Sequence, residues 1–165
     1  MFKIGVVSDT HVQTMQRPSL PKEVLTGLKG VDMIFHAGDI ISPKILDQLR
    51  AIAPVKAVCG NMDMELRGKL PEHLIEEVEG VKIGLAHGSG APKGIIERLK
   101  VLFNGEVQGI VFGHTHCPMA EEIDGIYFFN PGAAVDRVFS VINSYGILTV
   151  DNGRISGEIF EIEND

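Results

Sequence analysis

Five short apolar runs in this chain each end in a loop that carries aspartate, asparagine or histidine. The runs have the length of buried β-strands and cover 2–7, 32–36, 55–59, 81–86 and 109–112. The loops that follow read Ser8-Asp9-Thr10-His11, Ala37-Gly38-Asp39, Gly60-Asn61-Met62-Asp63, His87-Gly88 and Gly113-His114-Thr115-His116. Loops at the carboxyl ends of strands line the ligand crevice of α/β sheets. We therefore expect an α/β fold in which the five loops converge on one rim.

Helical patterns separate the first three runs. Val24, Leu25 and Leu28 have helical spacing after Pro21. Ser42-Pro43 then reads as an N-cap followed by proline at the first helical position. The apolar face of this second helix is Ile45, Leu46, Leu49 and Ile52. An alternation of strands and helices predicts parallel pairing with right-handed crossovers.

The second half of the chain adds hairpins. Turn signals at Glu79-Gly80, Asp124-Gly125 and Asn152-Gly153 each lie between two apolar runs. A helix that opens near Pro92 leads to the strand at 109–112. Mixed parallel and hairpin elements predict two packed sheets with helices outside, in a single domain over 1–165.

The composition narrows the function. The net charge is −7, so a broad nucleic-acid surface is not expected, and a bound phosphate would be neutralised by something other than side-chain cations. No apolar run is long enough to span a bilayer, and no leader pattern is recognisable at the start, so we expect a cytoplasmic protein. Cys59 and Cys117 are the only cysteines, and we expect both to be reduced.

The polar residues of the five loops form a set that suits metal ions. They comprise four imidazoles, two carboxylates and one carboxamide: Asp9, His11, Asp39, Asn61, His87, His114 and His116. Mixed nitrogen and oxygen ligands without thiolate favour Mn²⁺, Fe²⁺, Co²⁺, Ni²⁺ or Zn²⁺. Seven ligands exceed the needs of one four-coordinate ion. We therefore predict two ions, with Asp39 as the candidate bridge.

Each motif taken alone has a plainer explanation as a turn, a cap or a packed histidine. The occurrence of all five in order, each after a strand, favours the metal site. We assign His36 to the packed interior and His73 to solvent. The side chains of Lys93 and Arg98 could contact a substrate phosphate, but their helical positions favour a solvent-facing role.

The order D-x-H, G-D, G-N-x-D, G-H and G-H-x-H resembles the calcineurin-like metallophosphoesterase superfamily. The short chain and Asn130-Pro131-Gly132 resemble its small YfcE/MJ0936-type phosphodiesterase branch. The resemblance implies a four-layer αββα sandwich. It also implies one metal held by Asp9, His11, Asp39 and His116, and another held by Asp39, Asn61, His87 and His114, with Mn²⁺ favoured.

Two ions about 3.5–4 Å apart can bind a bridging water, lower its pKa and stabilise an in-line displacement at phosphorus. Asp39, Asn61, Asp63 and His87 are our candidate catalytic residues. The ions, Asp9, Asp39 and one hydroxide sum to a charge of about +1, which suits a phosphate. Arg137 is a candidate additional contact to that phosphate. Met62 departs from the larger family, whose third motif usually places histidine there to assist the leaving group.

We therefore predict metal-dependent hydrolysis of a small phosphodiester. Two alternatives stay open. One is another phosphoester substrate, such as a monoester or a nucleoside polyphosphate. The other is a non-catalytic interaction scaffold, since a retromer subunit shares the implied fold. We expect neither an extended nucleic-acid surface nor a membrane, and leave open a homo-oligomer.

Overall fold

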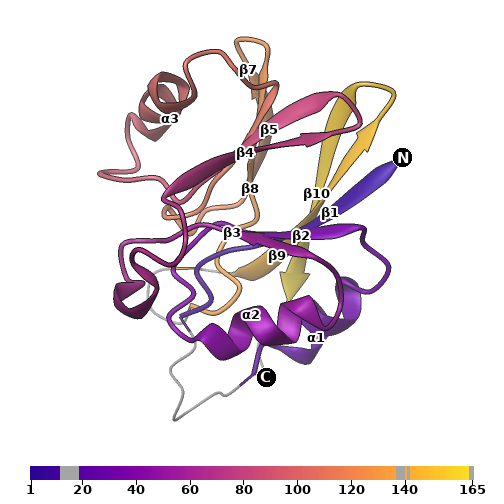
Figure 1. Cartoon of the computed structure of the whole chain (residues 1–165), viewed down its shortest axis with the longest axis vertical. Helices are drawn as coiled ribbons and strands as arrows, with labels where there is room; N and C mark the ends of the chain where they lie inside the picture. The colour runs from indigo at the N-terminus through magenta and orange to yellow at the C-terminus, as the bar shows by residue number, and fades with distance from the viewer. Residues whose placement is uncertain (12–18, 137–139, 141, 164–165) are drawn as a thin grey trace.

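Two five-stranded sheets form the centre of the molecule. The computed structural model describes residues 1–11, 19–136, 140 and 142–163. Within these residues the first sheet has the strand order β10-β9-β1-β2-β3 and the second has the order β4-β5-β6-β8-β7. Figure 1 shows the two sheets facing one another with helices on the outside.

The first sheet has a parallel centre. Strand β1 (Phe2–Val7) pairs in parallel with β2 (Met33–His36), which pairs in parallel with β3 (Val55–Ala57). Strands β9 (Asn143–Asp151) and β10 (Arg154–Ile162) complete the sheet as an antiparallel hairpin. The predicted parallel pairing is confirmed, and the register brings the carboxyl ends of β1, β2 and β3 to the same edge.

The second sheet is also mixed. Strand β5 (Val81–Ala86) is parallel to β6 (Gly109–Val111), and β6 is parallel to β8 (Ile126–Asn130). Strands β4 (His73–Val78) and β7 (Met119–Ile123) are antiparallel edges. The three predicted hairpins are confirmed. At each turn both central residues have positive φ, as the right-handed twist of a two-residue hairpin requires.

Helices cover the two outer faces. Helices α1 (Lys22–Gly27) and α2 (Pro43–Arg50) pack on the first sheet, and α3 (Ile95–Phe103) packs on the second (Figure 1). A short 3₁₀ turn, η1 (Met64–Leu66), follows the third loop. These helices and sheets form the four layers of the predicted αββα sandwich.

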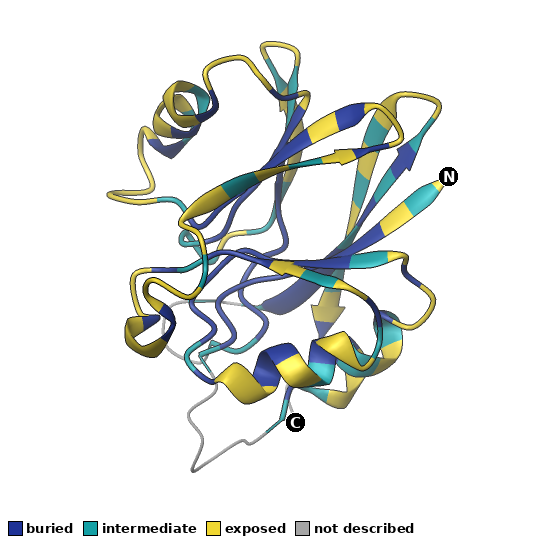
Figure 2. Cartoon of the chain, viewed as in Figure 1, coloured by how far each residue is buried: buried dark blue, intermediate teal, exposed yellow. Residues whose placement is uncertain are grey.

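Three apolar clusters hold the layers together. Between the sheets, side chains of β1 and β2 such as Val6 and Phe35 meet Leu85, Val111 and Phe129 of the second sheet, and these five are fully buried. The other two clusters lie under the helices. Burial of this apolar surface is the main favourable contribution to folding. Figure 2 shows that the buried residues continue from the strands into the loops at one end of the sheets.

Element boundaries differ slightly from the sequence predictions. Strand β3 ends at Ala57 and β6 ends at Val111, each before the predicted end. Helix α3 begins at Ile95 rather than at Pro92, because Gly94 adopts a left-handed conformation with φ of 85°. No helix in the described part of the chain has the length and apolar character needed to cross a bilayer.

Candidate metal centre

The five predicted loops meet at one end of the two sheets. The loops after β1 and β2 are tied together by backbone hydrogen bonds from Asp9 N to Gly38 O (3.0 Å) and from Thr10 N to Asp39 O (3.1 Å). A bond from Gly113 N to His87 O (3.1 Å) ties the loop after β6 to that after β5. The convergence expected from the sequence is therefore present.

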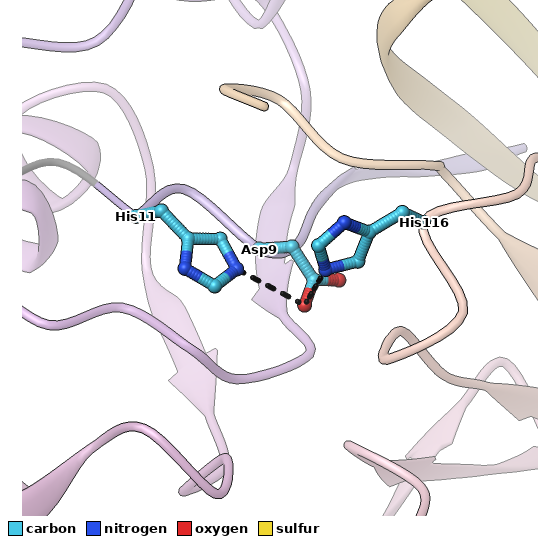
Figure 3. A group of neighbouring side chains, drawn as sticks. All are labelled: Asp9, His11 and His116. Carbon is cyan, nitrogen blue, oxygen red and sulfur yellow. Dashed lines mark ion pairs between the residues drawn. The ribbon is translucent and has the colours of Figure 1, made fainter. Parts of the chain in front are cut away.

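Asp9, His11 and His116 form a first triad of metal-binding side chains. Oδ1 of Asp9 lies 3.7 Å from Nε2 of His11 and 3.2 Å from Nε2 of His116. Figure 3 shows the two imidazoles approaching the carboxylate from different loops. The ligand atoms of these three residues all lie within 4.8 Å of one another, and the three belong to the first ligand set that the family resemblance implies.

Asp9, Asp39 and His87 form a second triad. Nε2 of His87 lies 3.4 Å from Oδ2 of Asp39 and 3.0 Å from Oδ1 of Asn61. Oδ2 of Asp39 is also 3.7 Å from Nε2 of His11, so this oxygen lies between imidazoles of both sets. That position is the one a bridging carboxylate needs.

Each carboxylate is held through one oxygen and presents the other to the imidazoles. Oδ2 of Asp9 accepts hydrogen bonds from Ser8 Oγ (2.7 Å) and His114 N (3.1 Å). Oδ1 of Asp39 accepts one from Met62 N (2.8 Å). The orientation of both carboxylates is therefore fixed by the surrounding loops.

Two polar atoms at the centre of this group have no hydrogen-bond partner among the described residues. They are Oδ1 of Asp9 and Nε2 of His11, and both are buried. A buried polar atom without a partner costs about 1–3 kcal/mol. A divalent cation would satisfy both atoms at once, and neutral imidazole with carboxylate suits Mn²⁺ or Zn²⁺. The residues present therefore fit a metal ion.

His114 lies beside the second triad but outside it. Its ring centroid is 5.2 Å from that of His87, and its Nε2 donates to Gly90 O at 2.8 Å. That bond leaves Nδ1 as the nitrogen with a free lone pair. The guanidinium of Arg98 in turn donates to the carbonyl oxygens of Ser89, Ala91 and Lys93, on both sides of Gly90. Arg98 thus supports the loop that orients His114, and it does not simply face solvent.

The backbone of the site is strained. Five of the predicted ligands have positive φ: Asp9, His11, Asp39, His114 and His116. Such conformations cost roughly 1–3 kcal/mol each outside glycine and concentrate at functional sites. Gly60 and Gly113 allow the loops to approach closely, since a Cβ at Gly60 would collide with Asp39 and one at Gly113 with Ser8. The convergence of these side chains is therefore accompanied by local strain in the backbone.

The electrostatics reflect the close packing of acids and imidazoles. Burial alone would raise the pKa of Asp9, but His11, His116 and His87 hold that pKa far below its usual value. Burial also opposes ionisation of Asp39, and His87 with the Met62 amide lowers its pKa nevertheless. The Asp9 carboxylate, whose Oδ1 lies 3.2 Å from Nε2 of His116, outweighs partial burial and raises the pKa of His116 to about 9. The carboxylates are therefore anionic and ready to bind cations.

Two residues outside the predicted ligand set support it. Asp136 accepts a hydrogen bond from Nδ1 of His116 at 2.5 Å, and the sequence interpretation missed it. It follows β8 in a loop that contains Gly132, so it repeats the strand-then-acid pattern over a longer loop. Asp63 is buried, and its two oxygens accept from Ile41 N (2.7 Å) and Gly60 N (2.8 Å). Asp63 therefore fixes two of the converging loops.

The remaining candidates occupy other positions. His36 is fully buried, accepts a hydrogen bond from Gly38 N through Nδ1 (3.1 Å), and has a pKa lowered to about 3 by burial. It is the packed histidine that the sequence predicts. His73 is exposed and lies edge-on to Phe103. The predicted phosphate contact, Arg137, lies outside the described residues.

Comparison with known proteins identifies the family. Residues 2–153 match the calcineurin-like phosphoesterase superfamily domain. The chain belongs to this superfamily. A probable metallophosphoesterase of Methanothermobacter thermautotrophicus is 35% identical over 160 residues, which cover 94% of this chain and 90% of that protein. The phosphodiesterase MJ0936 of Methanocaldococcus jannaschii is 28% identical over 79% of this chain and 83% of its own.

The fold of the superfamily is also found in solved structures. Vps29 of Entamoeba histolytica, complexed with zinc, has a TM-score of 0.76 and 26% identity, and the match covers 97% of this chain and 99% of that one. A single mutant of the same protein has a TM-score of 0.78 and 27% identity, over 98% and 100% of the two chains. The fold of this chain is thus shared with Vps29 proteins.

Proposed function

We propose that this protein is a dinuclear, divalent-metal-dependent phosphodiesterase that hydrolyses a small phosphodiester. One observation carries the proposal. Oδ1 of Asp9 and Nε2 of His11 are buried 3.7 Å apart, and neither has a hydrogen-bond partner within the described residues. The family match and the phosphodiesterase among the relatives support the reaction class.

In this proposal Asp9, His11, Asp39 and His116 hold one ion, and Asp39, Asn61, His87 and His114 hold the other. When bound, two such ions supply an activated water as nucleophile and stabilise the charge that develops on the transferring phosphorus group. Asp39 would serve both ions, a role that the position of its Oδ2 between His11 and His87 supports. We propose Mn²⁺ as the activating ion.

The chain's own residues provide orientation. His87 donates from Nδ1 to Ala37 O at 2.7 Å, which makes Nε2, 3.0 Å from Oδ1 of Asn61, the ring nitrogen that would face a metal ion. Asp63 does not need to contact the substrate, because both of its oxygens already hold backbone amides. We propose that Asp63 is a positioning residue and that Arg137 contacts the substrate phosphate. Ligands fixed before the reaction need no reorganisation during it.

The net charge and the cysteines support a proposal about the cations that the protein binds and the compartment in which it acts. The net charge of −7 makes bound cations the natural partners of an anionic substrate. Both cysteines are free in the structure, which agrees with a reducing compartment, and we propose the cytoplasm.

A second candidate function is a protein-interaction scaffold, favoured by the similarity to Vps29. The presence of a potential metal ligand at all seven predicted positions supports the enzyme, and the strained backbone at Asp9, His11 and Asp39 is typical of a functional site.

Turnover of bis-p-nitrophenyl phosphate tests the proposed function. We expect no activity after EDTA treatment, and activity restored by Mn²⁺, Co²⁺ or Ni²⁺. Asp9→Asn should remain inactive at metal concentrations that restore the wild type. Activity of the metal-free protein, or an inactive wild type that binds two ions, would contradict the proposal. The latter result would favour the scaffold.

A further inference from the structure

A cavity of about 560 Å³ opens beside the second predicted metal position. Its lining residues come mainly from the chain between β3 and β4 and from α3 with the loop before it. Figure 1 shows where these segments lie in the fold. Asn61 and His87 line the cavity and are also predicted metal ligands. The volume falls within the roughly 300–1,000 Å³ range of small-molecule sites. A phosphate at the metal centre would therefore have this space next to one of its ester oxygens.

Both walls of the cavity contribute apolar side chains. Leu70 lies on one wall, and Ile95, Leu99 and Leu102 lie on the wall formed by α3. Leu99 and Ile95 are buried in the core beneath, whereas Leu102 is 43% exposed. An exposed leucine at the edge of a pocket gains burial when an apolar group enters.

The charged residues of the lining do not form a second anion site. Arg98 uses its guanidinium on the carbonyl oxygens of Ser89, Ala91 and Lys93. Arg67 and Glu72 also line the cavity, and their formal charges are of opposite sign and cancel. An uncharged group therefore suits the cavity better than a second phosphate.

We propose that this cavity receives an uncharged aromatic or heterocyclic arm of the substrate, of about the size of a nucleobase or nucleoside. The inference rests on the proposed function, because the arm is placed relative to a phosphate at the metal centre. The cavity then selects aryl or nucleoside esters over small alkyl esters. Leu102 is the proposed specificity residue whose substitution tests this assignment most directly.

The test compares two phosphonates that differ only in their organic group. Phenylphosphonate and methylphosphonate are titrated by calorimetry into the Mn²⁺-loaded protein, with bis-p-nitrophenyl phosphate turnover as a check on the proposed function. The variant is Leu102→Ser. The matched control is Val101→Ser, because Val101 is the neighbouring residue of α3, is 80% exposed and does not line the cavity.

The wild type should bind phenylphosphonate about tenfold more tightly than methylphosphonate, as contacts in an apolar pocket allow. Leu102→Ser should remove most of this preference and leave methylphosphonate binding unchanged, and Val101→Ser should keep it. Equal affinities in the wild type, an unchanged preference in Leu102→Ser, or equal losses in both variants would overturn the cavity assignment. Turnover tests the proposed function separately. An active wild type that shows no preference for the aryl phosphonate would contradict only this inference. Aryl-selective binding without turnover would contradict only the proposed function.

Discussion

Nδ1 of His116 donates a hydrogen bond to Oδ2 of Asp136 over 2.5 Å. The bond orients the ring of His116 and directs its Nε2 toward Asp9, 3.2 Å away. A carboxylate behind a histidine ligand is a common way to orient the ring and increase its basicity. Asp136 is therefore a positioning residue for one of the two proposed ions.

Asp136→Asn should weaken binding of one Mn²⁺ by about 10–100-fold and leave the other nearly unchanged. The amide cannot hold the imidazole as strongly as the carboxylate does. Competition with a chelator, analysed for two sites, measures the change. Asp124→Asn is the control, because Asp124 lies at the β7–β8 turn and pairs with Lys100 of α3 rather than with a residue of the five loops. Unchanged affinity at both sites would remove Asp136 from this role.

Asp39→Asn should reduce activity more than Asn61→Ala, because it removes a shared anionic ligand. Oδ2 of Asp39 lies near both His11 and His87. Of these two histidines, Asn61 contacts only His87. Metal content and kcat measured on the same preparations give the comparison. An Asp39→Asn protein that holds two ions tightly and turns over normally would show that Asp39 is not the bridge.

Much of the fold could be predicted because its signals are local. Two-residue turns such as Asn152-Gly153 indicate hairpins, and Pro43 after Ser42 indicates the start of α2. The ends of strands are harder to predict than the turns, because β3 stops at Ala57 although Val58 is apolar and buried. Val58 is buried as part of a loop, and hydrophobicity alone does not distinguish a buried loop from a strand.

The site was predictable where residue types repeat after strands, and not where the contact depends on three-dimensional structure. Asp9 and His116 come from loops over a hundred residues apart, and the repeated motif pattern indicated their meeting. The contact of Asp136 with His116 crosses between two loops after different strands. Likewise, no sequence pattern indicates that Arg98 would turn to the carbonyl groups around Gly90.

Met62→His should help diesters with poor leaving groups more than p-nitrophenyl esters. The backbone amide of Met62 is bonded to Asp39, and its side chain is 51% exposed at the site, so a histidine there could reach a leaving group. Well-placed general acids contribute about 10²–10⁴-fold, and we expect less in a site not built for one. The measurement is kcat/KM across diesters graded by leaving-group pKa. Equal slopes in both proteins would place residue 62 away from the leaving group.

The metal-free protein should lose thermal stability between pH 6.5 and 9. The Asp9 carboxylate beside His116 raises the pKa of that histidine from 6.5 to about 9. The folded state therefore holds a proton that the unfolded state has released, and this stabilisation is complete below pH 6.5 and lost as the pH rises through 9. Metal affinity should rise over the same window, because the ion competes with that proton. Tm in EDTA and in Mn²⁺ at several pH values tests this, and a metal-free Tm that rises with pH would contradict it.

Anomalous diffraction from crystals soaked in Mn²⁺ tests the central claim most directly. We expect two peaks about 3.5–4 Å apart, as in two-metal hydrolytic sites. One peak should lie among Asp9, His11, Asp39 and His116, and the other among Asp39, Asn61, His87 and His114. A single peak, or peaks elsewhere on the molecule, would contradict the proposed dinuclear centre.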